Sequence, residues 1–365
     1  MRPRFLLLLA VLVASSPAPA QERGAFIVRL GRDTVVVESF LRAADRIQGR
    51  HISRAPETVV REYAATLAPD GTVRRVEWTT RGGGTTRRGS IEFSGDSALV
   101  ETAEGVQRLA APAGTLPFVS NSWALLELAT RRHRSAAAIS QPALTVGGSQ
   151  IRTIALDRLG ADSMTVTVIE GLPYRARVDD AGRVLGARWT GEWSVERLPQ
   201  LDLEALAADF ARRPLGALSP ADSVQATVGG ATLAVRYSRP AMRGRKIFGH
   251  IVPWNEVWRT GANEATLFST TADLEVGGMT VPAGTYTLWT IPSPSGWTLV
   301  LNRNTGQWGT DYSAQYDLAR LAMRVEPLTQ PVERFTIAIE PRGAGAVVTL
   351  EWETTRAAIA VRPKP

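Results

Sequence analysis

Residues 237–266 read YSRPAMRGRKIFGHIVPWNEVWRTGANEAT, and this stretch decides how the C-terminal part of the chain folds. Its glycines and prolines predict tight turns, because glycine readily adopts positive φ angles and proline fixes φ. Trp254 and Trp258 carry large apolar surfaces that a solvated loop would not need. We therefore predict a tightly specified loop structure at this point. No residue spacing within the stretch dictates a particular reaction.

Segments on both sides of this loop have the alternating pattern of β-strands. Val224–Val228 and Thr232–Tyr237 flank a Gly-Gly turn, which is typical of a β-hairpin. In residues 334–340 the large apolar side chains fall on alternate positions, so one face of that strand is predicted to be buried. Many short strands separated by turns predict an antiparallel β-sandwich, jelly-roll-like in character, over residues 222–365.

Residues 21–198 also have a β pattern. Residues 164–168 alternate apolar side chains with threonines, which predicts a strand with one wet face. Ser120–Arg134 interrupts the pattern as a helix, with Ser120 or Ser122 as its N-cap. We predict an N-terminal domain that is an antiparallel β-sheet or open barrel with one helix.

Two segments of this N-terminal region echo each other. Tyr63–Trp78 and Tyr174–Trp189 superpose without a gap, with glycine and valine at matching positions. Each segment has the pattern of a hairpin whose second strand ends in tryptophan. Two interpretations stay open: a two-fold internal repeat, or two hairpins that share only their general features.

A short helical connector, residues 199–221, separates the two β regions. Leu201–Arg213 spaces its apolar residues for one helical face, and Pro214 ends the helix. The residues that follow contain glycine, serine and proline, which places the domain boundary near 215–222.

The start of the chain has the three parts of a signal peptide. Arg2 and Arg4 supply basic charge, Phe5–Val13 is an apolar run, and an Ala-Pro-Ala sequence ends at Ala20. We predict that residues 1–20 are removed by cleavage near Ala20, which implies a periplasmic or extracellular protein. The apolar run is too short for a membrane span, which takes about 20 residues. No membrane span is expected elsewhere.

Composition narrows the classes of partner. The chain has no cysteine, which excludes disulfides and thiolate metal sites, and we predict neither a metal nor a cofactor. The formal net charge is +7, but the arginines are scattered. Nucleic-acid binding needs a concentrated basic stripe, so no nucleic-acid partner is expected.

Several segments of the C-terminal region together resemble the bacterial family known as domain of unknown function 2911. They are Tyr237–Pro240, Gly244–Gly249, Val257–Thr266, Pro282–Tyr286 and Asn302–Gly309. The resemblance extends over about residues 224–340 and implies export and a β-rich fold, without an established activity. The chain departs from the family pattern at Trp254-Asn255, where the family has Tyr-Gly, and the family does not require His250.

The same loop offers candidate ligand-binding residues. Arg259 can donate two parallel hydrogen bonds, Glu264 is a carboxylate, and Trp258 offers a stacking face. This combination favours binding of a saccharide or another cell-envelope component. The predicted ligand-binding residues are Arg245, Trp254, Trp258, Arg259, Asn263, Glu264 and Trp308. In the structural alternative, Arg259 and Glu264 pair with each other and Asn263 occupies a left-handed turn.

Catalytic signals are weak. The chain has three histidines and none of the motifs HExxH, G-x-S-x-G, the P-loop or the dinucleotide fingerprint. A second hypothesis is a hydrolase that uses Glu264 with Arg259 as electrostatic partner, or Glu264 with His250. Its second carboxylate would come from Glu256 or Asp273. A third hypothesis is a non-catalytic scaffold that binds another protein.

Overall fold

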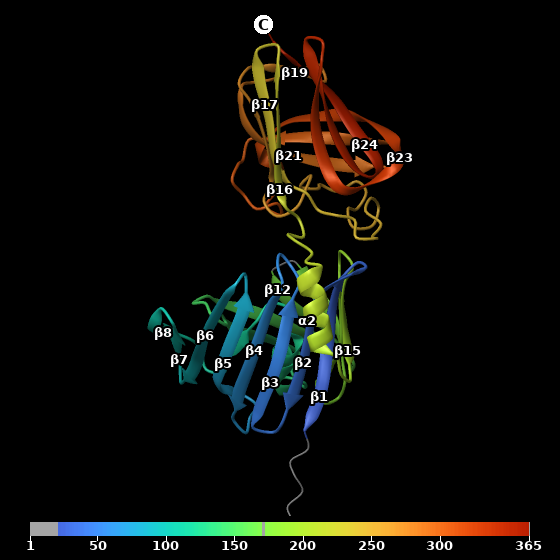
Figure 1. Ribbon diagram of the computed structural model, residues 1–365. Coiled ribbons are helices and arrows are strands. Elements are labelled where there is room, and N and C mark those ends of the chain that lie inside the picture. The colour runs from blue at the N-terminus through green and yellow to red at the C-terminus, as the bar shows by residue number, and fades with distance from the viewer. Residues whose placement is uncertain (1–20, 170–171, 365) are drawn as a thin grey trace, which may run out of the picture.

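The computed structural model describes residues 21–169 and 172–364. Two β-sheets follow one another along the chain, and the C-terminal sheet lies beyond one end of the N-terminal sheet (Figure 1). The described part contains two α-helices, α1 (Trp123–Arg132) and α2 (Leu203–Arg212), and neither is long and apolar enough to cross a membrane. The predicted mainly β fold class is confirmed. The expected signal peptide and its cleavage point lie outside the described residues.

The N-terminal sheet has fifteen strands in the order β8-β7-β6-β5-β4-β3-β2-β1-β15-β14-β13-β12-β11-β10-β9. In chain order these are β1 (Glu22–Leu30), β2 (Asp33–Arg42), β3 (Arg46–Ser53), β4 (Val59–Leu67), β5 (Val73–Gly82), β6 (Thr85–Ser94), β7 (Ser97–Thr102), β8 (Gly105–Ala110), β9 (Leu116–Phe118), β10 (Ala138–Thr145), β11 (Ile151–Arg158), β12 (Ser163–Ile169), β13 (Leu172–Val178), β14 (Val184–Trp189) and β15 (Trp193–Leu198). β1 pairs with both β2 and β15 and so joins the two halves of the sheet.

One strand pair departs from the antiparallel prediction. β9 and β10 are parallel, whereas all other described neighbours in this sheet are antiparallel. The reason is the connection between them: α1 lies between β9 and β10 in the chain, and a helical crossover allows parallel pairing.

The two segments that echo each other form hairpins of similar local geometry. Tyr63 lies opposite Trp78 in the β4–β5 hairpin. In the β13–β14 hairpin the rings of Tyr174 and Trp189 are 5.4 Å apart. The turn glycines at matching positions both have positive φ angles. The internal repeat itself stays a prediction.

A row of glycine and aromatic residues crosses strands β1 to β6 at one level. In order, the row is Gly24, Phe40, Gly49, Tyr63, Trp78 and Gly89, each opposite the next. Rings cover the places where side chains are missing: a Cβ added to Gly49 would lie 2.3 Å from the Oη of Tyr63. The glycines therefore let the large rings lie close against the inner face of the sheet, the face that α1 covers.

Helix α1 begins where the sequence predicted, with Ser122 as its N-cap accepting from the backbone N of Leu125 at 3.4 Å. The carboxylate of Glu38, from β2, reaches the same helix end. It accepts from the backbone N of Ala124 at 3.0 Å and from the Oη of Tyr63 at 2.8 Å. A buried carboxylate thus occupies the N-terminus of α1, where the helix dipole favours negative charge. Desolvation nevertheless raises the pKa of Glu38.

Helix α2 packs on the opposite, outer face of the N-terminal sheet. Asp202 caps it by accepting from the backbone N of Ala205 at 3.0 Å. Phe210 of the helix packs with Val37 of β2 and Ile52 of β3. The helix expected as a connector therefore covers part of this face, over β2 and β3.

The C-terminal sheet has nine strands in the order β16-β17-β18-β21-β22-β23-β24-β19-β20. They are β16 (Ala221–Val228), β17 (Ala231–Ser238), β18 (Thr266–Thr270), β19 (Leu274–Val276), β20 (Met279–Val281), β21 (Gly284–Ser293), β22 (Gly296–Asn302), β23 (Asp317–Arg342) and β24 (Gly345–Pro363), with a 3-10 turn at Ala314–Tyr316. Residues 334–340, expected as a strand, belong to one long strand, β23. Its pairing with β24 shifts register between Pro327 and Val332, where proline cannot donate to the ladder.

An aromatic cluster fills the C-terminal core beneath the loop. Trp258 stacks on Trp352 at a ring separation of 5.8 Å and packs edge-on against Phe335 at 5.0 Å. Phe248 packs edge-on against Trp297 at 4.8 Å. Because Phe248 and Trp258 belong to the 237–266 stretch, core packing fixes the loop in place.

Candidate functional site

Two segments that are distant in sequence pair directly on the loop side of the C-terminal domain. Glu264 and Trp308 form an isolated antiparallel bridge. The backbone N of Ala265 donates to the carbonyl of Gln307 at 3.3 Å, and the backbone N of Gly309 donates to the carbonyl of Asn263 at 2.9 Å. The Arg-Thr-Gly-Ala-Asn-Glu and Gln-Trp-Gly elements thus form one surface.

Glycine is required where these segments touch. A Cβ on Gly309 would lie 2.4 Å from the Cδ of Arg259 and 2.5 Å from the carbonyl oxygen of Asn263. Any larger residue at position 309 would push the two segments apart. The Gln-Trp-Gly element therefore needs its glycine for close approach.

The backbone of this surface is held in an uncommon conformation. Thr260 has a φ of 53° and Asn263 a φ of 61°. A positive φ is rare for a β-branched residue. Thr260 is held by hydrogen bonds: its Oγ1 donates to the Oγ1 of Thr290 at 3.0 Å, and its carbonyl accepts from the Oγ1 of Thr266 at 2.8 Å. The surface is built to keep one shape.

Three polar or aromatic groups of this surface are available to a ligand. Trp308 is 49% exposed. Glu264 is exposed and has no hydrogen-bond or ion-pair partner among the described residues. Arg259 is half-buried, and its only described side-chain hydrogen bond runs from Nε to the carbonyl of Gly261 at 3.5 Å. Burial lowers the pKa of Arg259. The Arg259–Glu264 pair of the structural alternative is not found.

Asn263 contributes mainly to architecture. Its Nδ2 donates to the carbonyl of Ser219 and to the Oγ of Ser238, both at 3.3 Å. Ser219 belongs to the segment that joins the two sheets. Asn263 therefore ties the candidate surface to that segment and occupies the left-handed conformation expected for it.

Trp254 and Trp258 lie mostly within the packing of the domain. Trp258 is part of the aromatic core, and Trp254 is half-buried and stacks on Phe248 at 6.0 Å. A Cβ on Gly249 would meet the Nε1 of Trp254 at 2.2 Å, so the indole lies directly over that glycine. Neither ring presents an open face comparable with that of Trp308.

Arg245 lies at the contact between the two domains. Its Nη1 donates to the carbonyl of Gly191 in the N-terminal domain at 2.8 Å. Its Nη2 and Nε donate to the carbonyls of Ala241 and Met242 at 2.7 and 2.9 Å. All three guanidinium nitrogens of Arg245 thus donate within the protein, at the contact between the domains and not at the surface formed by Glu264 and Trp308.

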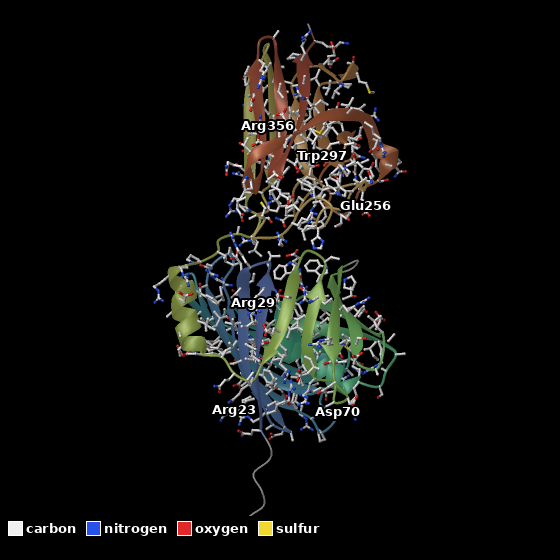
Figure 2. The ribbon with its side chains drawn as sticks, turned by 90° about the vertical axis from the view of Figure 1, so that its right-hand side faces the viewer. Arg23, Arg29, Asp70, Glu256, Trp297 and Arg356 are labelled. Carbon is white, nitrogen blue, oxygen red and sulfur yellow. The ribbon has the colours of Figure 1, made fainter. Side chains whose placement is uncertain are left out.

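His250 also faces the N-terminal domain. Its Nε2 lies 3.1 Å from the Oε1 of Glu192. The arrangement gives His250 a carboxylate partner other than Glu264, so the proposed catalytic pair is not assembled. Glu256, one proposed second carboxylate, is exposed on the loop side of the domain (Figure 2).

Asp273, the other proposed second carboxylate, holds backbone instead. Its Oδ1 accepts from the backbone N of Ala283 at 2.9 Å. In residues 21–169 and 172–364, no three His, Asp or Glu side chains gather closely enough to hold a metal ion.

The sequence did not point to cavities in the N-terminal domain, and the structure has them. A groove of about 1010 Å³ on the outer face is lined by charged side chains such as Arg50, Glu62 and Arg88. A second cavity of about 290 Å³ lies beside α1, and five of its eleven lining residues are aromatic. The available signal was the set of tryptophans at 123, 189 and 193, whose convergence depends on strand pairing.

The C-terminal region matches a known protein family. Residues 219–361 match the family described as protein of unknown function DUF2911. The DUF2911 region includes both segments that form the Glu264–Trp308 bridge, so the resemblance inferred from their motifs is confirmed. Among curated proteins, none is similar enough to be matched to this chain.

Two solved structures have limited similarity to the chain. A DUF1089 family protein from Pseudomonas aeruginosa is 16% identical, with a TM-score of 0.35, over 50% of this chain and 95% of that one. A β-barrel-like protein of the DUF1849 family from Brucella abortus is 9% identical, with a TM-score of 0.33, over 48% of this chain and 94% of that one. Similarity at this level adds nothing on function.

Proposed function

We propose that the protein binds a saccharide of the cell envelope at the Trp308 surface, which we define as Arg259, Asn263, Glu264 and Trp308. The observation that carries the proposal is the direct pairing of Glu264 with an exposed tryptophan on a backbone held in one conformation. A large aromatic side chain held at the surface beside a free carboxylate can serve as an anchor for a ligand ring.

The chemistry of the surface suits a sugar ring. The flat face of Trp308 can stack on the apolar C–H face of a pyranose, since aromatic side chains combine a large apolar area with defined geometry. Glu264 can accept hydrogen bonds from sugar hydroxyls. Arg259 can donate to hydroxyl or carboxylate oxygens, and charge-assisted hydrogen bonds of this kind are stronger than neutral ones.

The proposal includes the location and the division of the chain. Residues 1–20 direct export, and the mature protein acts in the periplasm or outside the cell. Residues 222–365 bind the ligand, and residues 21–198 form a separate N-terminal domain joined to them by residues 199–221. The motif of a signal peptide in the sequence supports this placement.

A glycan-binding measurement with the full-length mature protein tests the proposal. The probes are soluble peptidoglycan fragments and a panel of envelope oligosaccharides, with affinity measured by calorimetry. Trp308→Ala should weaken binding up to about tenfold, because a stacked aromatic contact contributes roughly 0.5–1.5 kcal/mol and about 1.4 kcal/mol is tenfold in affinity. Glu264→Gln should weaken it because the carboxylate acceptor is lost.

Met279→Ala is the matched control, because Met279 is 43% exposed and lies on β20, away from the bridge. The proposal fails if no probe binds the wild type, or if Trp308→Ala and Glu264→Gln bind like Met279→Ala. Release of shortened sugars by the wild type, lost in Glu264→Gln, would instead favour the hydrolase hypothesis.

A further inference from the structure

The N-terminal domain contains the smaller cavity beside α1, whereas the proposed saccharide site lies in the C-terminal domain. This cavity has a volume of about 290 Å³ and lies between α1 and the strands β12 to β15. We call it the aromatic pocket and define it by Phe118, Trp123, Tyr174, Trp189 and Trp193. Figure 2 shows these strands in green, with a hairpin directed at the C-terminal domain.

Neighbouring rings line the pocket as a continuous series. Trp123 of α1 meets Tyr174 of β13 edge-on, at 5.3 Å between ring centroids. Tyr174 meets Trp189 of β14 at 5.4 Å, and Trp189 meets Trp193 of β15 at 6.1 Å. Each ring thus comes from a different element, and the sheet register brings them together. Such a lining favours another aromatic ring, since offset and edge-on contacts are attractive.

The pocket is not a sealed part of the core. Tyr174, Trp189 and Trp193 are all partly exposed, although each packs against other rings. Monomer cores rarely leave three adjacent aromatic side chains around an unfilled space, because interiors are close-packed. The space is therefore available to a ligand from solvent.

One polar atom near the pocket has no partner. The Nε1 of Trp189 is buried and makes no hydrogen bond within the described residues. A buried donor without an acceptor is unfavourable. Because Trp189 lines the pocket, a ligand that shifts this ring on binding can bring an acceptor to its Nε1 and remove the deficit. The ligand is thus expected to carry a ring nitrogen or a carbonyl oxygen.

The charge of the ligand is also constrained. Ser122 and Trp123, at the start of α1, line the pocket, and a free helix N-terminus would attract an anion. Here Glu38 already occupies this end, accepting from the backbone N of Ala124 at 3.0 Å. A second negative charge beside Glu38 would be repelled while Glu38 is ionised. A neutral ligand is favoured.

The volume of the aromatic pocket limits the size of the ligand. An apolar cavity of about 150 Å³ accommodates one benzene ring. The aromatic pocket is roughly twice as large, which corresponds to two fused rings. We propose that the aromatic pocket binds a neutral, planar aromatic ligand of about two fused rings that carries one hydrogen-bond acceptor.

The test uses the full-length mature protein and four probes. Quinoline is neutral near pH 8 and has a ring acceptor, naphthalene lacks the acceptor, 2-naphthalenesulfonate is anionic, and octanol is an alkyl chain. Binding is followed by quenching of tryptophan fluorescence and by calorimetry. We expect saturable 1:1 binding of quinoline, several-fold tighter than that of naphthalene, and weaker binding of the other two probes.

Two variants connect binding to the pocket. Trp189→Phe keeps a ring but removes Nε1, so the preference for quinoline over naphthalene should disappear while naphthalene binding remains. Ser120→Trp places a large side chain at an exposed position of the pocket wall and should weaken quinoline binding at least tenfold. Ser94→Trp, at an exposed position on β6, is the control with the same tryptophan content.

The proposal is overturned if the wild type does not bind quinoline saturably, or if octanol or the sulfonate binds more tightly. It is also overturned if Ser120→Trp binds quinoline like Ser94→Trp, or if Trp189→Phe keeps the quinoline preference. Thermal unfolding checks that each variant is folded. Because Trp308→Ala leaves this pocket intact, failure here is distinguishable from failure of the saccharide proposal.

Discussion

Glu127 is completely buried, yet its carboxylate is surrounded by positive charge. It forms ion pairs with Arg42, Arg131 and Arg197. Burial alone would raise the pKa of Glu127, but the three arginines outweigh it and hold the pKa below its ordinary value. A single carboxylate on α1 thereby connects the helix to strands β2 and β15. The network fixes the helix in place, although buried ion pairs in general are weak evidence for net stability.

Removing this carboxylate should be costly. Glu127→Gln leaves the three guanidinium groups close together with only the partly exposed Glu22 as counter-charge, and breaking a buried pair costs about 3–5 kcal/mol. Urea unfolding measures the change. Glu196→Gln is the control, since the partly exposed Glu196–Arg29 pair should contribute no more than about 1 kcal/mol. Equal losses in the two variants would show that the network has no special role.

The buried side chain of His51 should make the stability of the protein depend on pH. Burial, with the positive charge of Arg61, lowers the pKa of His51 from 6.5 to about 3. Between these values the unfolded chain binds a proton that the folded protein does not, so this contribution to stability is lost as the pH falls through the window. The slope is up to about 1.4 kcal/mol per pH unit. His51→Asn should remove it.

The measurement is urea unfolding of wild type and His51→Asn across that pH window. Glu38, directly opposite His51 on β2, acts in the opposite direction, since a raised pKa stabilises at low pH, and it is present in both proteins. If the two proteins change stability in parallel with pH, His51 is not the titrating group.

At the scale of elements, the glycine–aromatic row determines how closely β1 to β6 approach their core. Gly49 is the most crowded position in this row. A Cβ there would lie 2.3 Å from the Oη and 2.4 Å from the Cζ of Tyr63. Tyr63 cannot move freely, because its Oη donates to Glu38 at the end of α1. Strand and helix are therefore coupled through one ring.

Gly49→Ala should destabilise the protein by about 1–3 kcal/mol, the range for overpacking a core. Gly296→Ala is the control, because nothing lies within 4 Å of the position of its Cβ. Both are compared by urea unfolding midpoints. A Gly49→Ala protein as stable as Gly296→Ala would show that Tyr63 has room to move.

Elements with local signals could be predicted from the sequence. The helices follow from Ser122, Asp202 and their apolar spacing, and the first C-terminal hairpin follows from its Gly-Gly turn. The long strand β23 could not be predicted from the sequence. Pro327 predicts an interruption at this point, but pairing with β24 continues beyond it. The parallel pairing of β9 with β10 depends on where α1 packs, and no local sequence pattern predicts that position.

The candidate site was predictable only in part. Trp308 was one of the predicted ligand-binding residues and is exposed, and the loop conformation followed from its turn residues. The partner of each side chain was not predictable. Arg245 pairs with Gly191 and His250 with Glu192 through contacts between domains, and residues separated this far in sequence have no spacing rule to relate them.

At the scale of the whole molecule, the two domains meet through turns of the N-terminal sheet and the 237–266 stretch. The backbone N of Arg32 donates to the carbonyl of Arg243 at 3.0 Å. Arg243 also forms an ion pair with Asp33, and both Arg243 and Arg245 are buried. These contacts support a defined arrangement of the domains (Figure 1).

Arg245→Ala should loosen that arrangement without unfolding either domain. It removes the side-chain donor from the carbonyls of Gly191 and Ala241, whereas the carbonyl of Met242 keeps the backbone N of residue 245. We expect faster proteolysis between residues 213 and 220 and a larger radius of gyration by X-ray scattering. Arg324→Ala, on an exposed arginine, is the control. Unchanged cleavage and scattering would mean that the other contacts suffice to hold the domains.

The position of β24 has a consequence for biosynthesis. It lies between β23 and β19, so residues 345–363 connect the two parts of the C-terminal sheet. β19 pairs with β20 as soon as both have been made, but this short hairpin can join the rest of the sheet only when residues 361–363 of β24 have been made. The N-terminal sheet is complete once β15 has emerged. A nascent chain stalled before residue 345 should therefore carry one finished domain and one protease-sensitive, chaperone-dependent remainder.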